Sequence, residues 1–511
     1  MNNEVELKLL IAPADVWRLW RLPLLKDCTR RILRVQRLIS IYYDTPTFDL
    51  YQHRVAVRLR RVGRRWIQTV KTEGNVTAGL HDRPEWESET QENTLNFQAL
   101  ADAKLRKFFD DETLRQALHP LFTTEFTRSR RIVELPGNTT VEFALDRGEI
   151  RAAGEQAPIC EVELELKSGD PAQLFTFALS LQDALPLRLE NTSKAERGYR
   201  LATHAQLTPV KAKTPQLIAD LSVHDAFVHI VQSCLTQVQA NEEGVLHRDD
   251  SEFVHQTRVA VRRLRSAFSV FADIVAKEKT TPLREELRWL AGELDSARNW
   301  DVFTRETLPP ILTAFPEHEG LAWLTTASAA IRQQYHLCAR AALTSSRYQK
   351  LLLTLGAWLT MQPWRNAAGV ETDPAKETSL VEFTAAILQK RQKQFKKRGK
   401  NIVSLTPSAR HRVRIAAKKL RYAAEFFSSL YARKPTRAYI AALSTLQDVL
   451  GALNDAATTV GLLREIKGAD NTSSPQQGID LILGWVTGAS HSRLKELEAK
   501  WEHFIDQKPF W

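Results

Sequence analysis

The sequence of 511 residues has only four cysteines and no long apolar run. The cysteines lie far apart, with neither the spacing of a metal site nor that of a disulfide framework, which is typical of a reducing compartment. The longest apolar stretch, near residues 351–361, is too short to span a bilayer. The first residues are acidic where a secretion signal has a basic and then an apolar segment. These absences predict a cytoplasmic protein without membrane insertion.

Negative charge is also in deficit, with 60 acidic residues against 71 Lys and Arg and a formal net charge of +11. A basic chain favours an anionic partner, which could be phosphate, nucleic acid or a membrane surface. Apolar residues make up 43% of the chain, so most of it should fold. Because 511 residues are too many for one core, we expect two domains. Composition does not predict the oligomeric state.

The amino-terminal segment alternates charged and apolar residues. In an extended strand, Glu4, Glu6 and Lys8 share one face while Leu7 and Leu9 take the other. An isolated pattern of this kind is typical of a solvated strand face, but acids or cations at spacing two recur over the first 200 residues. Further examples are Arg58 and Arg60, Glu85 and Glu87, Arg128 and Arg130, and Glu161, Glu163 and Glu165. Such faces suggest a site that holds a divalent cation and a polyanion together.

The strand patterns continue to about residue 167, with a few helical segments between them. Many antiparallel strands with one charged face predict a closed barrel with a polar lumen. A helix is expected from Asp170-Pro171 to about Ala184, followed by a polar loop over residues 191–194. Residues 204–218 contain two prolines without a clear period, which predicts a linker.

Beyond the linker, helical spacing replaces the strand patterns, which predicts an all-helical domain of bundle type. This region contains a repeat in which a His-led stripe of three cations lies on one face of a helix. A lone helical His is usually structural, but the duplication favours anion binding, and nucleic acid remains an open alternative. The repeat predicts two related halves. Its basic positions are His255, Arg258, Arg262, Arg263 and Arg265 in the first copy and His411, Arg414, Lys418, Lys419 and Arg421 in the second.

These motifs resemble two known families. The segment 450–455, Leu-Gly-Ala-Leu-Asn-Asp, together with the His stripes resembles CHAD, the conserved-histidine α-helical domain, over about residues 219–506. The order of the two regions in one chain is similar to bacterial CYTH-CHAD proteins of the inorganic triphosphatase type. The first region, over about residues 1–203, resembles the CYTH superfamily of triphosphate tunnel metalloenzymes through Glu4-x-Glu6-x-Lys8, Tyr43-Asp44-Thr45, Arg58-x-Arg60, Lys71, Arg128-x-Arg130, Glu161-x-Glu163 and Ser193-Lys194.

The resemblance implies an α+β protein of two domains. Residues 1–203 would form an eight-stranded antiparallel β tunnel, and residues 219–506 a helical bundle of two related halves. The implied activity is hydrolysis of inorganic tripolyphosphate to pyrophosphate and phosphate, with Mg²⁺ or Mn²⁺ as cofactor. The helical domain is expected to bind long-chain polyphosphate.

The same resemblance implies roles for the charged residues of the tunnel. Forked guanidinium groups suit phosphate oxygens, and a hard cation prefers carboxylate oxygens. One acid would hold the attacking water, and Glu6 is the candidate. The predicted catalytic residues are Glu4, Glu6, Lys8, Arg58, Arg60 and Lys71, the substrate-binding residues are Arg58, Arg60, Lys71, Arg128, Arg130 and Lys194, and the metal ligands are Glu4, Glu6, Glu161 and Glu163.

Other functions fit the same residues. A thiamine triphosphatase or a class IV-type adenylate cyclase would use a similar phosphate clamp and would differ in the contacts to the organic group. A non-catalytic scaffold that binds polyphosphate or another polyanion is the third possibility. The acid pairs count against a scaffold, because a pure anion binder gains nothing from carboxylates that face its ligand. Glu142 and Asp146 could orient site residues or form structural ion pairs, whereas Tyr43 and Asp44 predict a turn and packing contact.

Overall fold

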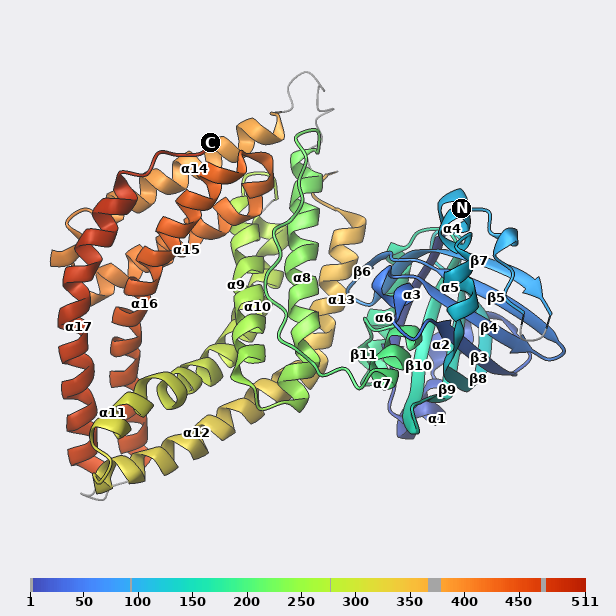
Figure 1. The fold of residues 1–511 in the computed structure, drawn as a ribbon, viewed down its shortest axis with the longest axis horizontal. Helices are drawn as coiled ribbons and strands as arrows, with labels where there is room; N and C mark the ends of the chain where they lie inside the picture. The colour runs from blue at the N-terminus through green and yellow to red at the C-terminus, as the bar shows by residue number, and fades with distance from the viewer. Residues whose placement is uncertain (1–2, 92–93, 276, 366–377, 470–474) are drawn as a thin grey trace. The chain divides into compact units, whose positions relative to one another are not determined.

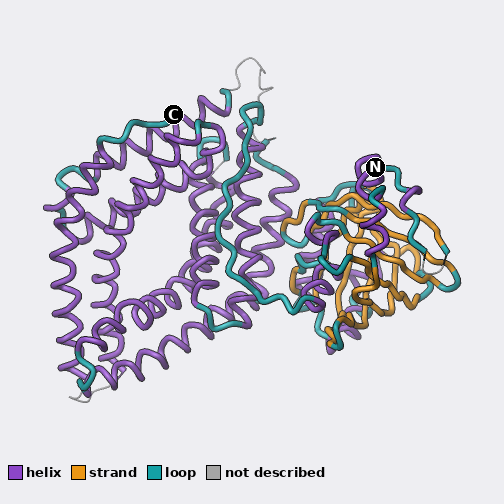
Figure 2. The backbone as a smooth tube through the Cα atoms, viewed as in Figure 1, coloured by secondary structure: helices purple, strands orange, loops and turns teal. Residues whose placement is uncertain are grey.

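The computed structural model describes residues 3–91, 94–275, 277–365, 378–469 and 475–511. Contacts divide the chain into two compact units, one of residues 1–208 with 344–362 and one of residues 209–343 with 363–511. Strands make up the core of the first unit, and the second is built from helices (Figure 2). Within the described ranges, no helix is both long and apolar enough to cross a membrane.

The first unit is built on a closed antiparallel barrel, as predicted. Strand β7 pairs with β1 as well as with β5, with Arg83 opposite Glu4, and this pairing closes the ring. The short strands β2 (Thr29–Ile32), β6 (Asn75–Thr77) and β11 (Arg188–Leu189) pair at its margins. Around the barrel, in hydrogen-bonded order, lie β1 (Asn3–Leu10), β10 (Glu155–Ser168), β9 (Thr139–Ala152), β8 (His119–Leu135), β3 (Gln36–Asp44), β4 (Ala56–Val62), β5 (Arg65–Lys71) and β7 (Leu80–Thr90).

The period of two assigns the faces of the barrel wall. Apolar residues such as Leu7 and Leu9 of β1 are buried on the outer face, opposite the charged residues of the same strand. Phe143 of β9, also on the outer face, contacts the ring of Trp20 and that of Phe177. The wall is therefore covered on the outside by helices, which leaves the lumen to polar residues.

Short helices line the margins of the barrel, and a helix from much later in the chain joins them. Helix α13 (Ser346–Met361) packs against α6 (Ala172–Ala184) and β11. The predicted domain boundaries do not anticipate this. The other helices are α1 (Val16–Leu19), α2 (Pro23–Cys28), α3 (Asp49–Gln52), α4 (Ala103–Phe109), α5 (Glu112–Ala117) and α7 (Lys194–Ala202).

One local prediction in this unit is wrong. Residues 191–194 do not form a loop throughout, because Ser193 is the N-cap of α7 and its hydroxyl accepts a hydrogen bond from Glu196 N at 3.1 Å. Lys194 is thus the first residue of a helix. The expected turn at Asp44 is confirmed, since its buried carboxylate accepts hydrogen bonds from the backbone N–H groups of Leu50 and Tyr51.

The second unit is a helical bundle, as predicted, and the repeat lies on two helices that pack against each other. These are α9 (Ser251–Val270) and α15 (Pro407–Phe427). Each also packs against the helix before it and the helix after it in the chain. Phe271 and Phe427, which follow the two stripes at equivalent positions, place their ring centroids 6.0 Å apart. The helices of this unit are α8 (Val223–His247), α9 (Ser251–Val270), α10 (Lys277–Val302), α11 (Leu308–Ala314), α12 (Glu319–Thr344), α14 (Leu380–Arg398), α15 (Pro407–Phe427), α16 (Arg433–Ala469) and α17 (Pro475–Ile505) (Figure 1).

Candidate active site

A cavity of about 550 Å³ lies among the inward-facing residues of the barrel. Arg130 and Glu161 are in the predicted site but not in the lining of this cavity, although each contacts neighbours in the same polar network. The wall also includes Tyr42, Arg83 and Tyr199. The predicted residues that line the cavity are Glu4, Glu6, Lys8, Arg58, Arg60, Lys71, Arg128, Glu163 and Lys194.

Acids and cations alternate along one side of the cavity. Glu4 forms an ion pair with Lys71, whose ammonium group also lies 3.1 Å from Glu85. Glu6 accepts from Arg83 at 3.1 Å and lies 2.9 Å from Lys8. Burial alone would raise the pKa of the Glu6 carboxyl, but Lys8 holds this pKa below its usual value. These carboxylates therefore stay ionised at neutral pH.

Glu163 has the densest set of cationic neighbours in the site. Its carboxylate lies 2.5 Å from Lys8 and 2.9 Å from Lys194, and it also accepts from Arg128. Burial opposes ionisation, yet Lys194, Lys8 and Arg128 together hold the pKa of Glu163 well below its usual range. Burial lowers the pKa of Lys8, but Glu163 and Glu6 outweigh it and hold this pKa above its usual value. The result is a buried network in which the charged forms are favoured.

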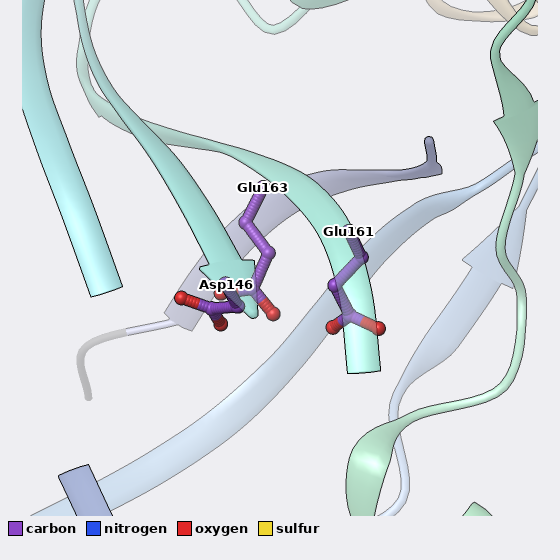
Figure 3. A group of neighbouring side chains, drawn as sticks. All are labelled: Asp146, Glu161 and Glu163. Carbon is purple, nitrogen blue, oxygen red and sulfur yellow. The ribbon is translucent and has the colours of Figure 1, made fainter. Parts of the chain in front are cut away.

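Three carboxylates converge at the inner side of this network (Figure 3). Oxygen atoms of Asp146, Glu161 and Glu163 all lie within 4.8 Å of one another, and all three residues are buried. Lys194 contacts each of them, at 2.7 Å for Asp146 and 2.9 Å for Glu163. An all-oxygen donor set of this kind has the chemistry that Mg²⁺ and Mn²⁺ prefer. The trio offers oxygen atoms of the kind that a hard cation takes, at a place where Lys194 contacts all three carboxylates, and it includes two of the four predicted metal ligands.

Asp146 was undervalued from the sequence. Its carboxylate is fully buried and accepts from Arg128 at 2.6 and 2.7 Å. Its position opposite Glu161 depends on the β9–β10 register, which sequence spacing does not reveal. In the sequence, the one sign that Asp146 faces the lumen is its spacing of two from Ala144 and of four from Glu142, which places all three on one face of the strand. Glu142 itself pairs with Arg130 at 3.3 Å, and so it belongs to the same polar face.

Arg60 differs from the other cations of the cavity. It donates to the Ser40 hydroxyl at 3.1 Å, and within the described residues it has no carboxylate at ion-pair distance. Burial, with repulsion from Arg58 and Arg128, lowers the pKa of Arg60 to about 10. Arg58, in contrast, lies 3.5 Å from Glu85. The cavity therefore presents a partly buried guanidinium group without a carboxylate at ion-pair distance among the described residues, which suits an anionic ligand.

The two cationic stripes of the helical unit approach each other. Arg262 of α9 donates to the hydroxyl of Tyr422 on α15 at 2.7 Å, so the stripes lie on adjoining helix faces. Burial and the nearby charges of Arg262, Arg414 and Arg258 lower the pKa of Lys418 to about 6. Four cations from the two copies thus form one cluster. We call Arg258, Arg262, Arg414 and Lys418 the paired-stripe cluster.

The two copies are not equivalent in their histidines. Burial, followed by the nearby charge of Arg298, lowers the pKa of His255 to about 4, which leaves it neutral. Its Nδ1 atom is buried, and no partner for it lies within the described part of the chain. His411 is exposed and its Nδ1 lies 2.5 Å from Asn454 Oδ1.

The remaining basic positions of the repeat lie outside the paired-stripe cluster. Arg263 is buried, donates to Glu425 at 2.5 Å and stacks on Phe426 at 4.9 Å. Arg421 lies 3.6 Å from the same Glu425. Arg265 and Lys419 are exposed. Sequence spacing thus identifies the basic segment, but the structure divides it into a cluster and a set of residues around it.

The fold and the lumen residues define a class of protein. Residues 2–199 match the CYTH domain and residues 229–464 match the CHAD domain. The chain belongs to the CYTH-CHAD proteins, with a CYTH barrel followed by a CHAD helical domain.

Three relatives illustrate what the chain is similar to. The chain is 36% identical over 216 residues to the inorganic triphosphatase of Haemophilus influenzae, a match that spans 41% of this chain and 57% of the relative. An uncharacterized protein of Mycobacterium tuberculosis is 27% identical over 424 residues, which cover 76% of this chain and 75% of that protein. The crystal structure of the CHAD domain from the plant Ricinus communis is 35% identical, with a TM-score of 0.50, and covers 57% of this chain and 96% of that one.

Proposed function

We propose that the barrel hydrolyses inorganic tripolyphosphate to pyrophosphate and phosphate, with Mg²⁺ or Mn²⁺ as cofactor. The observation that carries this proposal is the cavity, which places Arg58, Arg60 and Arg128 opposite acids in one buried space. A tripolyphosphate carries several negative charges, so guanidinium forks can bind its oxygens while carboxylates serve a metal. The likeness to a relative named inorganic triphosphatase supports this choice of substrate.

The acids of the lumen supply the oxygen atoms for the cation. Glu4, Glu6, Glu161 and Glu163 would hold it, and Asp146 lies close enough to Glu161 and Glu163 to take part. When bound, the cation would offset the charge that develops on the phosphate oxygens during hydrolysis.

The protein's own groups have separate tasks in this reaction. Arg58, Arg60 and Arg128 bind and orient the phosphates, while Lys71 and Lys194 add compact positive charges. Arg130 lies outside the cavity lining and would reach the phosphates only from beside it. Glu6 is ionised at neutral pH, which suits a group that accepts a hydrogen bond from the attacking water. Lys8 keeps Glu6 and Glu163 in place by contacting both.

We also propose that the helical unit binds long-chain polyphosphate through the paired-stripe cluster. Burial, and then the nearby charges of Arg262, Arg414 and Arg258, lower the pKa of Lys418, and an extended anion along the two helices would offset those charges. The rest of the basic repeat would surround that contact: His255, Arg263, Arg265, His411, Lys419 and Arg421.

A phosphate-release panel tests the first proposal. The purified chain is assayed with tripolyphosphate, pyrophosphate, ATP and thiamine triphosphate, each with Mg²⁺, Mn²⁺ or a chelator. We expect tripolyphosphate with metal to be cleaved fastest by at least about 10-fold, because cations outnumber acids in the cavity lining and a tripolyphosphate presents phosphate oxygens at both of its ends. Faster turnover of thiamine triphosphate, or release of cyclic AMP from ATP, would assign the site to those reactions. Absence of all turnover would make the barrel a scaffold.

A further inference from the structure

We propose that α13 supports the activity of the barrel, because its residue Gln349 positions the segment from which Lys194 reaches into the cavity. This inference rests on the function proposed above. Helix α13 comes about 140 residues after α7 and lies inside the CHAD-matched range, yet by its contacts it groups with the barrel. The helix, α6 and β11 are labelled in Figure 1.

The packing of α13 against the barrel unit is close. A Cβ atom at Gly356 would lie 2.3 Å from Phe175 Cε1 and 2.9 Å from Ala78 Cβ, so only glycine allows the helix to approach α6 at this distance. Lys350 adds an ion pair of 2.6 Å to Asp183 at the end of α6. These contacts fix the distance of α13 from α6 and the direction of its axis.

Gln349 joins the helix to the sheet by a buried hydrogen bond. Its side chain is 1% exposed, and its Oε1 accepts from the backbone N–H of Leu189 at 2.9 Å. Leu189 belongs to β11 and lies opposite Leu9 of β1. Because this N–H is buried, loss of the acceptor would leave it without compensation. Gln349 therefore completes the pairing of β11 at the edge of the barrel.

The chain leads from this hydrogen bond directly to the cavity. Glu190 N donates to the carbonyl of Lys8 at 2.9 Å, and Gly79 N donates to the side chain of Asn191 at 2.9 Å. Three residues after Asn191, Lys194 opens α7 and its ammonium group reaches Asp146 and Glu163. One end of this short segment, at Leu189, is thus held by α13. The other end, at Lys194, contacts the carboxylates of Asp146, Glu161 and Glu163.

The proposed role is that of a positioning residue, because Gln349 is not among the residues that line the cavity. A displacement of the segment 188–194 would move Lys194 relative to Glu163. When a group that positions the substrate is displaced by roughly 1 Å, the reaction rate can fall by about 100-fold. The alternative is that α13 only covers the apolar face of α6, in which case Gln349 would affect stability alone.

Three variants of the full chain separate these roles. Gln349→Leu keeps the size but removes the acceptor, and Gln349→Glu keeps an acceptor oxygen. Gln392→Leu is the matched control, since Gln392 is also a buried helical glutamine and donates to the Tyr439 hydroxyl at 3.2 Å in the other unit. For each variant we would measure the melting temperature, hydrogen exchange over residues 188–194, and kcat and KM for tripolyphosphate with Mg²⁺.

We expect Gln349→Leu to increase exchange over residues 188–194 and to lower kcat/KM by about 10- to 100-fold. Gln349→Glu should recover part of both losses, and Gln392→Leu should lower only the melting temperature. If Gln349 acts through Lys194, Lys194→Gln with Gln349→Leu should be no slower than Lys194→Gln alone. Independent, multiplicative losses in the double variant would overturn the proposal.

Two further outcomes are distinct. Wild-type kcat/KM and exchange in folded Gln349→Leu would reduce α13 to a cover. If that variant does not fold, Gly356→Ala, which pushes α13 away from Phe175, replaces it with the same expected losses. If the wild-type chain itself does not cleave tripolyphosphate, the proposed function fails, while exchange over residues 188–194 still tests whether Gln349 holds the segment.

Discussion

Arg60 and Arg58 lie two residues apart on one strand, yet the protein compensates their charges differently. Glu85 lies 3.5 Å from Arg58, whereas Arg60 has the Ser40 hydroxyl and two neighbouring guanidinium groups. A partly buried cation without a carboxylate partner costs some stability, and an anionic ligand would offset that cost. From this difference we expect Arg58 to contribute to the stability of the fold and Arg60 to contribute mainly to ligand binding.

This leads to a prediction for the two arginines. Arg60→Ala should raise KM for tripolyphosphate by about 10-fold or more while leaving the melting temperature unchanged or higher, because the removed charge is partly buried and has no carboxylate partner among the described residues. Arg58→Ala should also weaken binding but should lower the melting temperature, since Glu85 loses a partner. Lysine at either position should restore only part of the activity, because the forked geometry is lost. Full rescue by lysine at both positions would show that charge alone matters.

The lumen acids give a second prediction. Glu4→Gln and Glu6→Gln should each lower kcat by about 100-fold or more, because these groups are assigned to the metal and the attacking water. Glu149→Gln is the control, since this carboxylate lies on the outer part of β9 and pairs with Arg151. Circular dichroism would verify the fold, and turnover would be followed over a range of Mg²⁺ concentrations. Activity like that of the wild type, with metal still required, would contradict the assignment.

At the scale of elements, the strands that alternate strictly were predictable and their partners were not. The faces of Glu4, Glu6 and Lys8, and of Glu161 and Glu163, follow from a period of two. Which strands adjoin depends on contacts between distant segments, such as the pairing of β1 with both β7 and β10. This long-range register is what brings Asp146 beside Glu161, and for that reason the sequence indicated the acids without indicating the trio.

Helix ends and distant packing account for the other differences. Lys194 was expected in a loop because Asn191, Thr192 and Ser193 are polar, but the last of these is the N-cap of α7. In α13, the helical pattern was visible, but nothing in the periodicity shows that Gly356 faces Phe175. The two stripes were predicted as helix faces, and their convergence depends on the packing of α9 against α15.

The paired-stripe cluster predicts a pH dependence of binding. The pKa of Lys418 is about 6 in the free protein, so this side chain is mostly neutral at pH 7.5. A bound polyphosphate would raise that pKa, which means that protons are taken up on binding. The contribution of Lys418 is complete below about pH 6 and is lost as the pH rises through the higher pKa of the bound state. Affinity for long-chain polyphosphate should therefore fall between pH 6 and 8.

Calorimetry in buffers of different ionisation enthalpy would measure this uptake. At pH 7 we expect close to one proton per site in the wild type, and almost none in Lys418→Met, whose affinity should change little with pH. Equal proton uptake by both proteins would show that Lys418 does not contact the anion.

At the scale of the molecule, the two compact units do not coincide with two consecutive stretches of sequence. A fragment that ends near residue 205 would lack α13, and the remaining fragment would carry α13 without the barrel. Experiments that assign one activity to each unit should therefore keep the chain whole and change side chains. This requirement follows from the packing of α13 on α6.

The last prediction applies that approach to the helical unit. Each stripe spans about ten residues, or ~15 Å of helix, which suits an extended chain of phosphates better than one small anion. Reversal of the four cations of the paired-stripe cluster to Glu should abolish retention of long-chain polyphosphate. In the wild type, affinity should rise with polyphosphate length and fall steeply with salt, because binding releases counterions.

The control reverses the same number of exposed cations away from the cluster, namely Arg464, Lys467, Lys495 and Lys508. Circular dichroism and thermal unfolding of each preparation would verify that the helical unit is folded. If duplex DNA of matched charge binds as tightly as polyphosphate, or if both reversals weaken binding equally, the cluster is part of a general basic surface and polyphosphate is not its specific ligand.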